Sequence, residues 1–205
     1  MKKLEDLAAF ALEYAAGLVD YVEVRSRVQI GEELTRVDNY SLAPRRSFAS
    51  GLAVRIWHGG WGFASTCQLD PQAIIRTVDL ARALAGTKKV TLSPPATEQA
   101  QWQGPSELDP FSLPLSCKLE LLSEIEGKLR LSPQVVASKA ALIFSQEEQL
   151  FLNSRGARIK QRKLESGYSL KVVVSDGTQT ITRSYPNCLG GGFAQGGFEY
   201  IQRAD

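Results

Sequence analysis

The chain has 205 residues, of which 43% are hydrophobic and 22% charged, as expected for one ordinary globular domain or a compact pair of half-domains. Its 24 Lys and Arg residues nearly balance its 22 Asp and Glu residues, and a net charge of +2 argues against a nucleic-acid-binding surface. No run of about 18 apolar residues is present, so no membrane span is expected. Glu5 and Asp6 interrupt the region where a signal peptide needs apolar residues, so a cytoplasmic protein is expected.

The cysteines and the single histidine restrict the possible chemistry. Cys67, Cys117 and Cys188 are widely spaced and odd in number, which predicts reduced thiols, with Cys67 and Cys117 buried. Because His58 is the only histidine, a zinc site of the His-x-x-x-His kind is excluded within this chain. His58 is followed by two glycines, which predicts an exposed hairpin turn rather than a catalytic position.

The first half of the chain is predicted to contain helices and antiparallel strands. Apolar residues spaced by three or four positions indicate helices, and strict alternation of apolar and polar residues indicates half-buried strands. Gly31, Glu32 and Glu33 are predicted to form the first turn, and Asp70 is predicted to cap a helix that begins at Pro71. The predicted elements are a helix over residues 4–15, strands over 22–30, 34–42, 51–57 and 61–65, and a helix over 71–86.

The second half opens with a stretch rich in proline and poor in apolar residues, residues 93–110, which predicts a surface linker. A third helix is expected to open at Ser112 and Pro114 and to close at Ser132–Pro133, with apolar residues from Leu115 to Leu129 on one face. Further strands follow, joined by turns at 153–156 and 176–177. The predicted strands cover 136–144, 149–152, 157–163, 168–174 and 178–185. These elements predict an α+β fold in which antiparallel sheet meanders carry two or three helices on one face, as a two-layer structure.

Aromatic residues gather around the predicted hairpin at residues 57–63. Trp57, Trp61 and Phe63, with Arg55 among them, suggest a base-stacking platform or a cross-strand packing pair. Packing is the favoured interpretation, because few basic residues accompany the aromatic ones.

Basic and glycine-rich segments offer weaker signals. Residues 158–163 alternate Arg158, Lys160 and Arg162, a pattern that suits an anionic partner, a solvated strand face or a charge-protected edge strand. The solvated or edge interpretation is favoured there, and Arg45–Arg46 and Lys88–Lys89 are smaller basic spots. Glycines 190–192 lack the Lys-Ser/Thr of a phosphate-binding loop, and the tail after them shows no long helix or strand pattern.

One stretch of sequence resembles a known family. Residues 51–66 read Gly-Leu-Ala-Val-Arg-Ile-Trp-His-Gly-Gly-Trp-Gly-Phe-Ala-Ser-Thr. This stretch resembles the G-x-A-V-R-V segment, short turn and W-G-F-A-S-T segment of the TldD/PmbA family. Residues 21–25 resemble the family's first strand and residues 153–156 resemble its N-S-x-G turn. The resemblance covers nearly the whole chain.

The resemblance implies an activity that this chain does not carry by itself. The family consists of cytosolic zinc metalloproteases, often described as modulators of DNA gyrase, whose members are considerably longer than this chain. The active subunit carries His-Glu-x-x-x-His and a further cysteine ligand in its C-terminal half, and a sister subunit lacks the intact motif. No His-Glu pair occurs here and the whole chain resembles the N-terminal half, so no catalytic residue, zinc ligand or cofactor is assigned to it, Cys188 included.

The resemblance therefore predicts a non-catalytic N-terminal domain over residues 1–187, followed by a glycine-rich junction, residues 188–205, toward a C-terminal metalloprotease domain. Such a domain would enclose the active-site cavity and contribute to a dimer with a sister subunit or with itself, around a peptide substrate. The alternatives are a stand-alone or sister-subunit-like interaction module and, less favoured, a nucleic-acid binder. The residues predicted to make cavity or dimer contacts are Arg55, Trp61, Phe63, Ser65 and Thr66.

Overall fold

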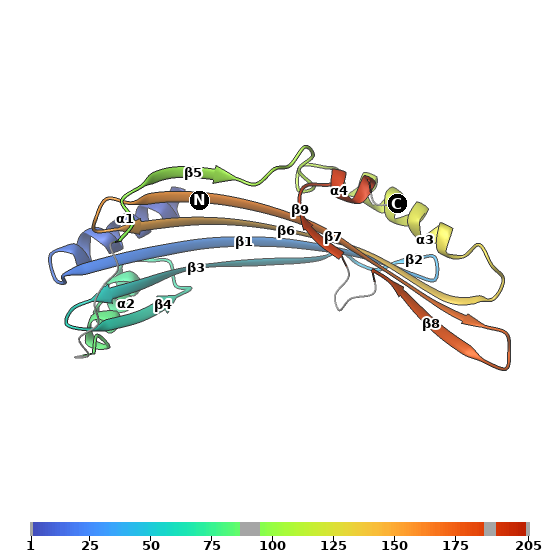
Figure 1. Ribbon diagram of the computed structural model, residues 1–205, viewed down its shortest axis with the longest axis horizontal. Coiled ribbons are helices and arrows are strands. Elements are labelled where there is room, and N and C mark those ends of the chain that lie inside the picture. Colours follow the sequence, from blue (N-terminus) through green and yellow to red (C-terminus); the bar gives the residue numbers. More distant parts are fainter. Residues whose placement is uncertain (1, 87–94, 187–191, 204–205) are drawn as a thin grey trace. The chain divides into compact units, whose positions relative to one another are not determined.

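The computed structural model describes residues 2–86, 95–186 and 192–203 (Figure 1). The chain divides into two compact units, each assembled from three separate segments. Unit 1 consists of Met1–Gln29, Phe48–Gln103 and Glu147–Arg162, and unit 2 consists of Ile30–Ser47, Gly104–Gln146 and Lys163–Asp205.

Four helices and nine strands are found in the described residues. In chain order they are α1 Lys2–Ala16, β1 Tyr21–Val37, β2 Tyr40–Ser41, β3 Arg45–Trp57, β4 Trp61–Thr66, α2 Pro71–Ala83, β5 Gln99–Gln103, α3 Leu115–Leu129, β6 Val135–Asn153, β7 Arg158–Ser175, β8 Thr180–Tyr185, β9 Gly192–Gln195 and α4 Glu199–Gln202. The strands β1, β3, β6 and β7 each begin in one unit and end in the other.

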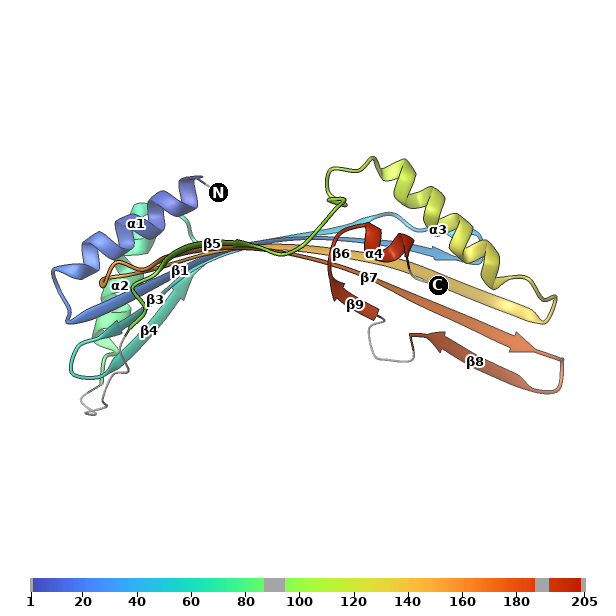
Figure 2. The same ribbon diagram turned by 45° about the horizontal axis from the view of Figure 1, so that its top comes forward.

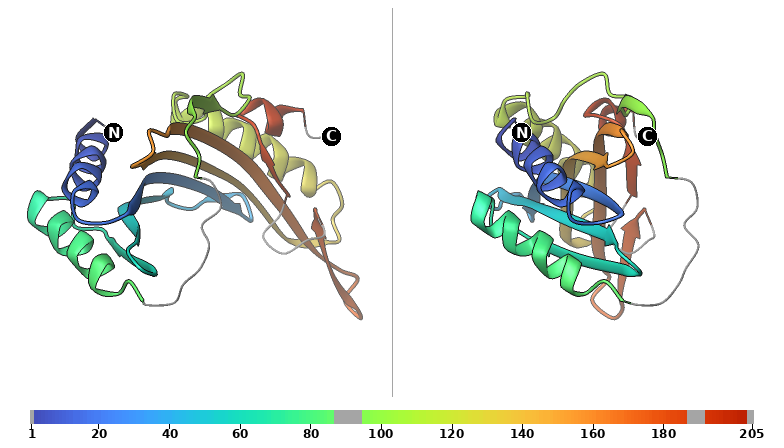
Figure 3. Two further views of the ribbon diagram at one scale, coloured as in Figure 1. Left: turned by 60° about the vertical axis from the view of Figure 1, so that its left-hand side comes forward. Right: turned by 90° about the vertical axis from the view of Figure 1, so that its left-hand side faces the viewer.

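Unit 1 is a sheet with helices on one face. Its strands are hydrogen-bonded in the order β4-β3-β1-β6-β7-β5, and α1 and α2 lie side by side (Figure 3). Alternate residues of each strand point toward these helices, because successive side chains of a strand face opposite sides. The resulting core joins Ala8, Ala11, Ile74 and Val78 of the helices to Val22, Val24, Leu52, Val54, Ile56, Leu150 and Leu152 of the strands.

Helix α2 and the residues that follow it approach the β3–β4 hairpin so closely that two positions require glycine. A Cβ atom on Gly62 would lie 1.8 Å from the carbonyl oxygen of Ala81, and one on Gly60 would lie 1.7 Å from that of Gly86. The helix itself begins as predicted, because the Asp70 side chain accepts a hydrogen bond of 2.9 Å from the Ala73 backbone N–H. The glycine in the W-G-F part of the family stretch is thus a packing requirement.

Unit 2 has a core of its own between its strands and α3 and α4 (Figure 2). A buried ion pair joins Lys118 of α3 to Glu32 of β1, and Lys118 Nζ also donates to the Pro110 carbonyl over 3.0 Å. Arg46 pairs with the same glutamate at 3.1 Å. The apolar part of this core consists of Leu34, Leu122, Ala140, Leu142, Phe144, Tyr168, Phe198 and Ile201.

The α+β prediction and the positions of the three long helices are confirmed. The turn predicted at residues 31–33 is wrong, because β1 continues to Val37 and the chain turns at Asp38 and Asn39, which have φ values of 48° and 70°. Glu32 can lie inside the strand because Lys118 neutralises it within the core.

Three further predictions need correction. Residues 136–152 form one strand rather than two, as do residues 158–174, within β6 and β7. The range 93–110 is not only a linker, because β5 lies within it and pairs in parallel with β7, although 93 and 94 lie outside the described residues. The prediction for the tail is not among them, since β9 and α4 have only four residues each; Phe198 and Ile201 of the tail are buried in the unit 2 core with Phe144.

Candidate functional site

Among the described residues of unit 1, no helix or strand covers the face of the sheet opposite α1 and α2. The alternation that sends Val24, Leu52 and Val54 into the core sends the residues between them to this second face. We call it the open face. The residues on the open face are Arg25 and Arg27 of β1, Gly51, Ala53 and Arg55 of β3, Phe63 and Ser65 of β4, and Gln149 and Phe151 of β6.

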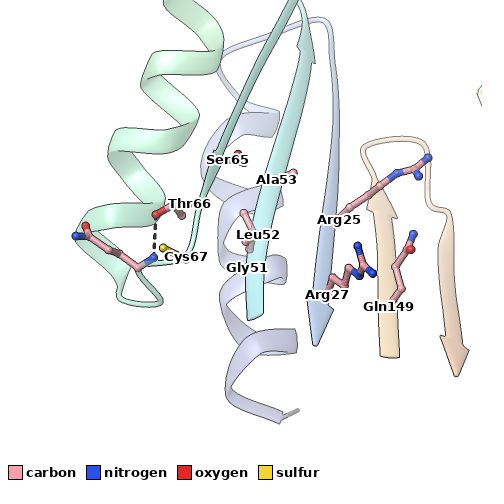
Figure 4. A pocket seen from close by; sticks show the side chains of 10 residues that line it. Arg25, Arg27, Gly51, Leu52, Ala53, Ser65, Thr66, Cys67 and Gln149 are labelled. Atoms are coloured by element: carbon pink, nitrogen blue, oxygen red, sulfur yellow. Dashed lines mark hydrogen bonds between the residues drawn. The ribbon is translucent and has the colours of Figure 1, made fainter. Parts of the chain in front are cut away.

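A groove runs along β3 on the open face, because Gly51 and Ala53 are small and their neighbours on both sides are larger (Figure 4). It consists of two hollows, of about 680 and 290 Å³, that share Arg25 and Ala53. We call it the β3 groove. Gly51 and Ala53 form its floor, Arg25 and Arg27 lie on the β1 side, and Ser65 and Cys67 lie on the β4 side.

The arginines of the groove differ in their partners. Arg27 forms an ion pair with Glu147 and donates to Gln29 over 3.0 Å. Arg55 forms an ion pair of 2.7 Å with the buried Glu23. Arg25 lies over the Phe151 ring, 5.1 Å from its centroid, and has no carboxylate partner among the described residues. The groove therefore keeps one uncompensated positive charge.

A buried polar cluster supports one end of the groove. The Tyr21 hydroxyl donates to Glu23 over 3.0 Å, and the Arg55 guanidinium lies 4.6 Å from the centroid of the Trp61 ring. Burial raises the pKa of Tyr21, and the neighbouring Glu23 carboxylate raises it further, so this hydroxyl stays a donor at neutral pH. The cluster fixes the direction of the Arg55 side chain.

The N-S-x-G turn completes this cluster. Asn153 Oδ1 accepts hydrogen bonds from the backbone N–H groups of Arg155 and Ala157, over 2.9 and 3.0 Å, and so closes the turn. Its Nδ2 donates to the Ala96 carbonyl over 2.8 Å and to the Tyr21 hydroxyl over 3.3 Å. The asparagine therefore joins the β6–β7 turn to β1 and to the segment before β5.

Four of the five residues singled out from the sequence line the groove: Arg55, Phe63, Ser65 and Thr66. Trp61 lies beside it and stacks against Arg55. The role of these five in cavity or dimer contacts remains a prediction. Arg25, Arg27 and Gln149 were not singled out, although the strand alternation already placed the two arginines on the polar side of β1.

The aromatic residues of the β3–β4 hairpin pack against one another, as the favoured interpretation of the sequence predicted. Trp57 and Trp61 are directly opposite each other in the β3–β4 register, and their ring centroids are 5.5 Å apart in an edge-to-face arrangement. Tyr21 meets Trp61 edge to face at 6.1 Å. His58 lies exposed in the turn, with Nδ1 3.3 Å from an Asp20 carboxylate oxygen that is itself largely exposed.

The prediction that the thiols of Cys67 and Cys117 are buried is wrong. Cys67 and Cys117 are both exposed rather than buried, because Cys67 follows the end of β4 and Cys117 lies on the outer side of α3. Cys188 lies outside the described residues. Within the described part of the chain, no three His, Cys, Asp or Glu side chains are grouped so that they could hold a metal ion, so these residues do not fit a zinc site.

The basic stretch at the start of β7 is neutralised within unit 1. Arg158 and Lys160 pair with Glu5 at 3.1 and 2.7 Å, and the hydrogen bond from Lys160 lowers the pKa of Glu5. This stretch is not an edge strand, since β5 pairs with it in parallel. Lys88 and Lys89 lie outside the described residues. In the described ranges no helix has the length and apolar character needed to cross a membrane.

Unit 2 contains a hollow of its own, of about 550 Å³, that is lined in part by tyrosines. Tyr168 lies between Tyr185 and Tyr200, with ring centroids 6.1 and 6.2 Å away. Burial, and then a hydrogen bond with Tyr185, raises the pKa of Tyr168 to about 12. The carboxylate of Glu199 lies nearby and accepts backbone hydrogen bonds from Leu108 and Gly197.

An alkaline titration is expected to resolve Tyr168. A raised folded-state pKa means that the unfolded chain loses this proton first, so the stability it contributes is present below pH 10.0 and is lost as the pH rises through about 12. Tyrosinate absorbance should therefore show a phase near pH 12 that Tyr168→Phe removes. Tyr40→Phe, at an exposed tyrosine, should leave that phase in place. Persistence of the phase in Tyr168→Phe would assign it to another residue.

Two family descriptions match the sequence. Residues 33–85 match the PmbA/TldA metallopeptidase domain 1, and residues 108–203 match the PmbA/TldA metallopeptidase central domain. Together the two ranges take in most of the chain. No match was found among curated proteins.

Solved structures share the fold. A candidate modulator of DNA gyrase from Thermotoga maritima MSB8 is 10% identical, with a TM-score of 0.75 over 93% of this chain and 42% of that chain. A second candidate modulator, from Bacteroides thetaiotaomicron VPI-5482, is 16% identical, with a TM-score of 0.68 over 88% and 43%. TldE from Thermococcus kodakarensis is 14% identical, with a TM-score of 0.63 over 94% and 42%.

These three structures are all much longer, and the chain spans less than half the length of each. The family matches fall on both units, and the stretch over residues 51–66 forms the floor of the β3 groove and its β4 side. The chain belongs to the PmbA/TldD metallopeptidase family.

Proposed function

We propose that this chain is the non-catalytic N-terminal part of a TldD/PmbA-like zinc metallopeptidase and that its open face encloses part of the active-site cavity. The observation that carries the proposal is the placement of the family stretch. Three alternate residues of this stretch, Gly51, Ala53 and Arg55, line the β3 groove and do not belong to the core. The described residues do not fit a zinc site, so the hydrolytic step is assigned to a part of the enzyme outside this chain.

The groove suits an extended peptide. Strand β4 is outermost in the strand order of unit 1, beside the groove, and no strand of the described residues pairs with its outer edge, so an added strand can pair there. The floor made by Gly51 and Ala53 leaves room for side chains of such a strand. The proposed contribution of this chain is therefore to hold peptide substrate in extended form, and the proposed assembly is a dimer with a sister subunit or a second copy.

A binding experiment tests the role of the groove. The purified chain should bind a fluorescein-labelled extended peptide, measured by anisotropy, without cleaving it when zinc is added. Ala53→Leu fills the floor of the groove and should weaken binding about tenfold or more, equivalent to about 1.4 kcal/mol. Ala100→Leu is the control, because Ala100 is exposed on β5, away from the groove.

Two results would contradict the proposal. Zinc-dependent cleavage by the chain alone would overturn the non-catalytic assignment. Equal binding by Ala53→Leu, Ala100→Leu and the unaltered chain would remove the groove from the peptide path. Absence of any peptide binding would favour the second candidate function.

The second candidate is a protein-interaction module without a part in peptidase activity. It is favoured by two large side chains in unit 2, Tyr40 and Leu42, which are 76% and 52% exposed. Exposed apolar side chains close together are typical of a protein–protein contact. Sedimentation of Tyr40→Ser and Leu42→Ser variants should then show loss of a self-associated species that the unaltered chain forms.

A further inference from the structure

We infer that Arg25 gives the β3 groove a preference for acidic peptide segments, by binding a carboxylate of the segment. This inference rests on the proposed function, since it names the class of peptide that the groove selects. It concerns a residue that lies outside the stretch over residues 51–66 and was not among the five candidates, although it ends the segment 21–25 that resembles the family's first strand.

Two of the three arginines on the open face are already paired with carboxylates. Arg27 is neutralised by Glu147, and Arg55 by Glu23. Arg25 has only the Phe151 ring as a described partner, at 5.1 Å. A guanidinium on an aromatic face keeps its N–H donors available at the ring's edge, so a carboxylate can be bound in bidentate fashion.

Arg25 occupies a central position in the β3 groove. It lines both hollows of the groove, together with Ala53, so a strand laid along β3 passes this side chain wherever it begins. The Arg25 side chain extends from β1 toward β6, the next strand in the sheet order (Figure 4). There its guanidinium carbon lies 5.1 Å from the centroid of the Phe151 ring, which supports the side chain from that side. The support reduces the entropy lost when a ligand orders the side chain.

The charges of the open face suit a single carboxylate better than a nucleic-acid backbone. A nucleic-acid backbone presents a phosphate at every nucleotide and needs several unpaired cations in a row. The open face offers one, and the carboxylates of Glu23 and Glu147 lie on the same groove face as counter-charges. A single carboxylate on a largely neutral peptide matches this charge distribution better than a phosphate chain.

The test compares two labelled peptides that differ only in one central residue, Glu or Gln. The unaltered chain should bind the Glu peptide about tenfold more tightly, as for one charge-assisted hydrogen-bonded pair. Arg25→Gln should remove the preference while retaining the affinity for the Gln peptide. Arg76→Gln is the matched control, since Arg76 is exposed on α2, on the helix-covered side of the same unit.

Far-UV circular dichroism verifies that every variant is folded, so that a change in binding can be attributed to the substituted side chain. A preference that survives in Arg25→Gln, or no preference in the unaltered chain, overturns the inference but leaves the proposed peptide binding in place. Failure of both peptides to bind overturns the peptide role and the inference with it. Displacement of the peptide by single-stranded DNA with a steep salt dependence would overturn the inference in favour of a phosphate-binding face.

Discussion

Lys118→Met is expected to lower the free energy of unfolding by about 3–5 kcal/mol, because it leaves a buried carboxylate without its principal partner. Lys118 and Glu32 are 2% and 4% exposed. After the substitution Glu32 would keep only Arg46, whose side chain is 71% exposed. The Pro110 carbonyl would also lose its hydrogen bond from Lys118.

Urea unfolding followed by far-UV circular dichroism measures this effect, because that signal includes the strands and helices of unit 2. Lys128→Met is the matched control on the same helix. Lys128 is 70% exposed and pairs with Glu124 one turn away, so its loss should cost no more than about 0.5 kcal/mol. The double variant Lys118→Met with Glu32→Leu should recover much of the lost stability, since no unpaired charge is then buried. Equal stability of Lys118→Met and Lys128→Met would show that the Glu32 pair is open to solvent.

Gly62→Ala is expected to lower the free energy of unfolding by about 3 kcal/mol, because there is no room for a methyl group between β4 and α2. The Ala81 carbonyl oxygen lies 1.8 Å from the position of the new Cβ, and the Ala85 backbone nitrogen lies 2.8 Å from it. Both are backbone atoms, so the helix has to move as a whole. The displacement should also disturb Trp61, the residue before Gly62.

Tryptophan fluorescence during urea unfolding is the suitable measurement, because all three tryptophans of the sequence, Trp57, Trp61 and Trp102, belong to unit 1. Gly17→Ala is the control: Gly17 is exposed after α1 and a Cβ there would meet nothing within 4 Å. A Gly62→Ala variant as stable as Gly17→Ala would mean that α2 does not lie against β4 as described.

The helices could be predicted from the sequence because each depends on signals within its own residues. Asp70 and Pro71 determine the start of α2 through one hydrogen bond and one fixed backbone angle. The turns at Gly156 and Gly177 were predicted for the same reason, since both glycines have positive φ values. Local chemistry is sufficient for such features.

The lengths of the strands could not be predicted, because alternation reports burial rather than strand conformation. The interruption in the pattern of β6 falls where the strand passes from unit 2 to unit 1, at Gln146–Glu147. In β7 the interruption, residues 164–167, follows the boundary between the units and includes the buried Leu164 and Ser166, so this explanation applies to β6 alone. Among the described residues, those from Ser145 to Gln149 belong to neither apolar core. Without a core to cover them, polar residues continue the strand and resemble a turn in the sequence.

The candidate site was predicted only as far as its motif. The family stretch led to Arg55, Phe63, Ser65 and Thr66, which do line the groove. Arg25 became prominent only when the structure showed that Arg27 and Arg55 have carboxylate partners. Which charge is available to a ligand depends on ion pairs between residues distant in sequence. A local sequence pattern does not show these ion pairs.

The interleaving of the two units has a consequence for synthesis of the protein. Unit 1 begins with α1 but needs the segment Glu147–Arg162 to complete its sheet, and unit 2 needs residues after Lys163. A ribosome that has translated as far as Gln146 therefore holds a chain in which neither core is closed. The apolar faces of α1, β1 and β3 stay exposed until the strands that cover them have been synthesised. Folding therefore depends on pairing between residues distant in sequence, which is slow and leaves the nascent chain open to aggregation.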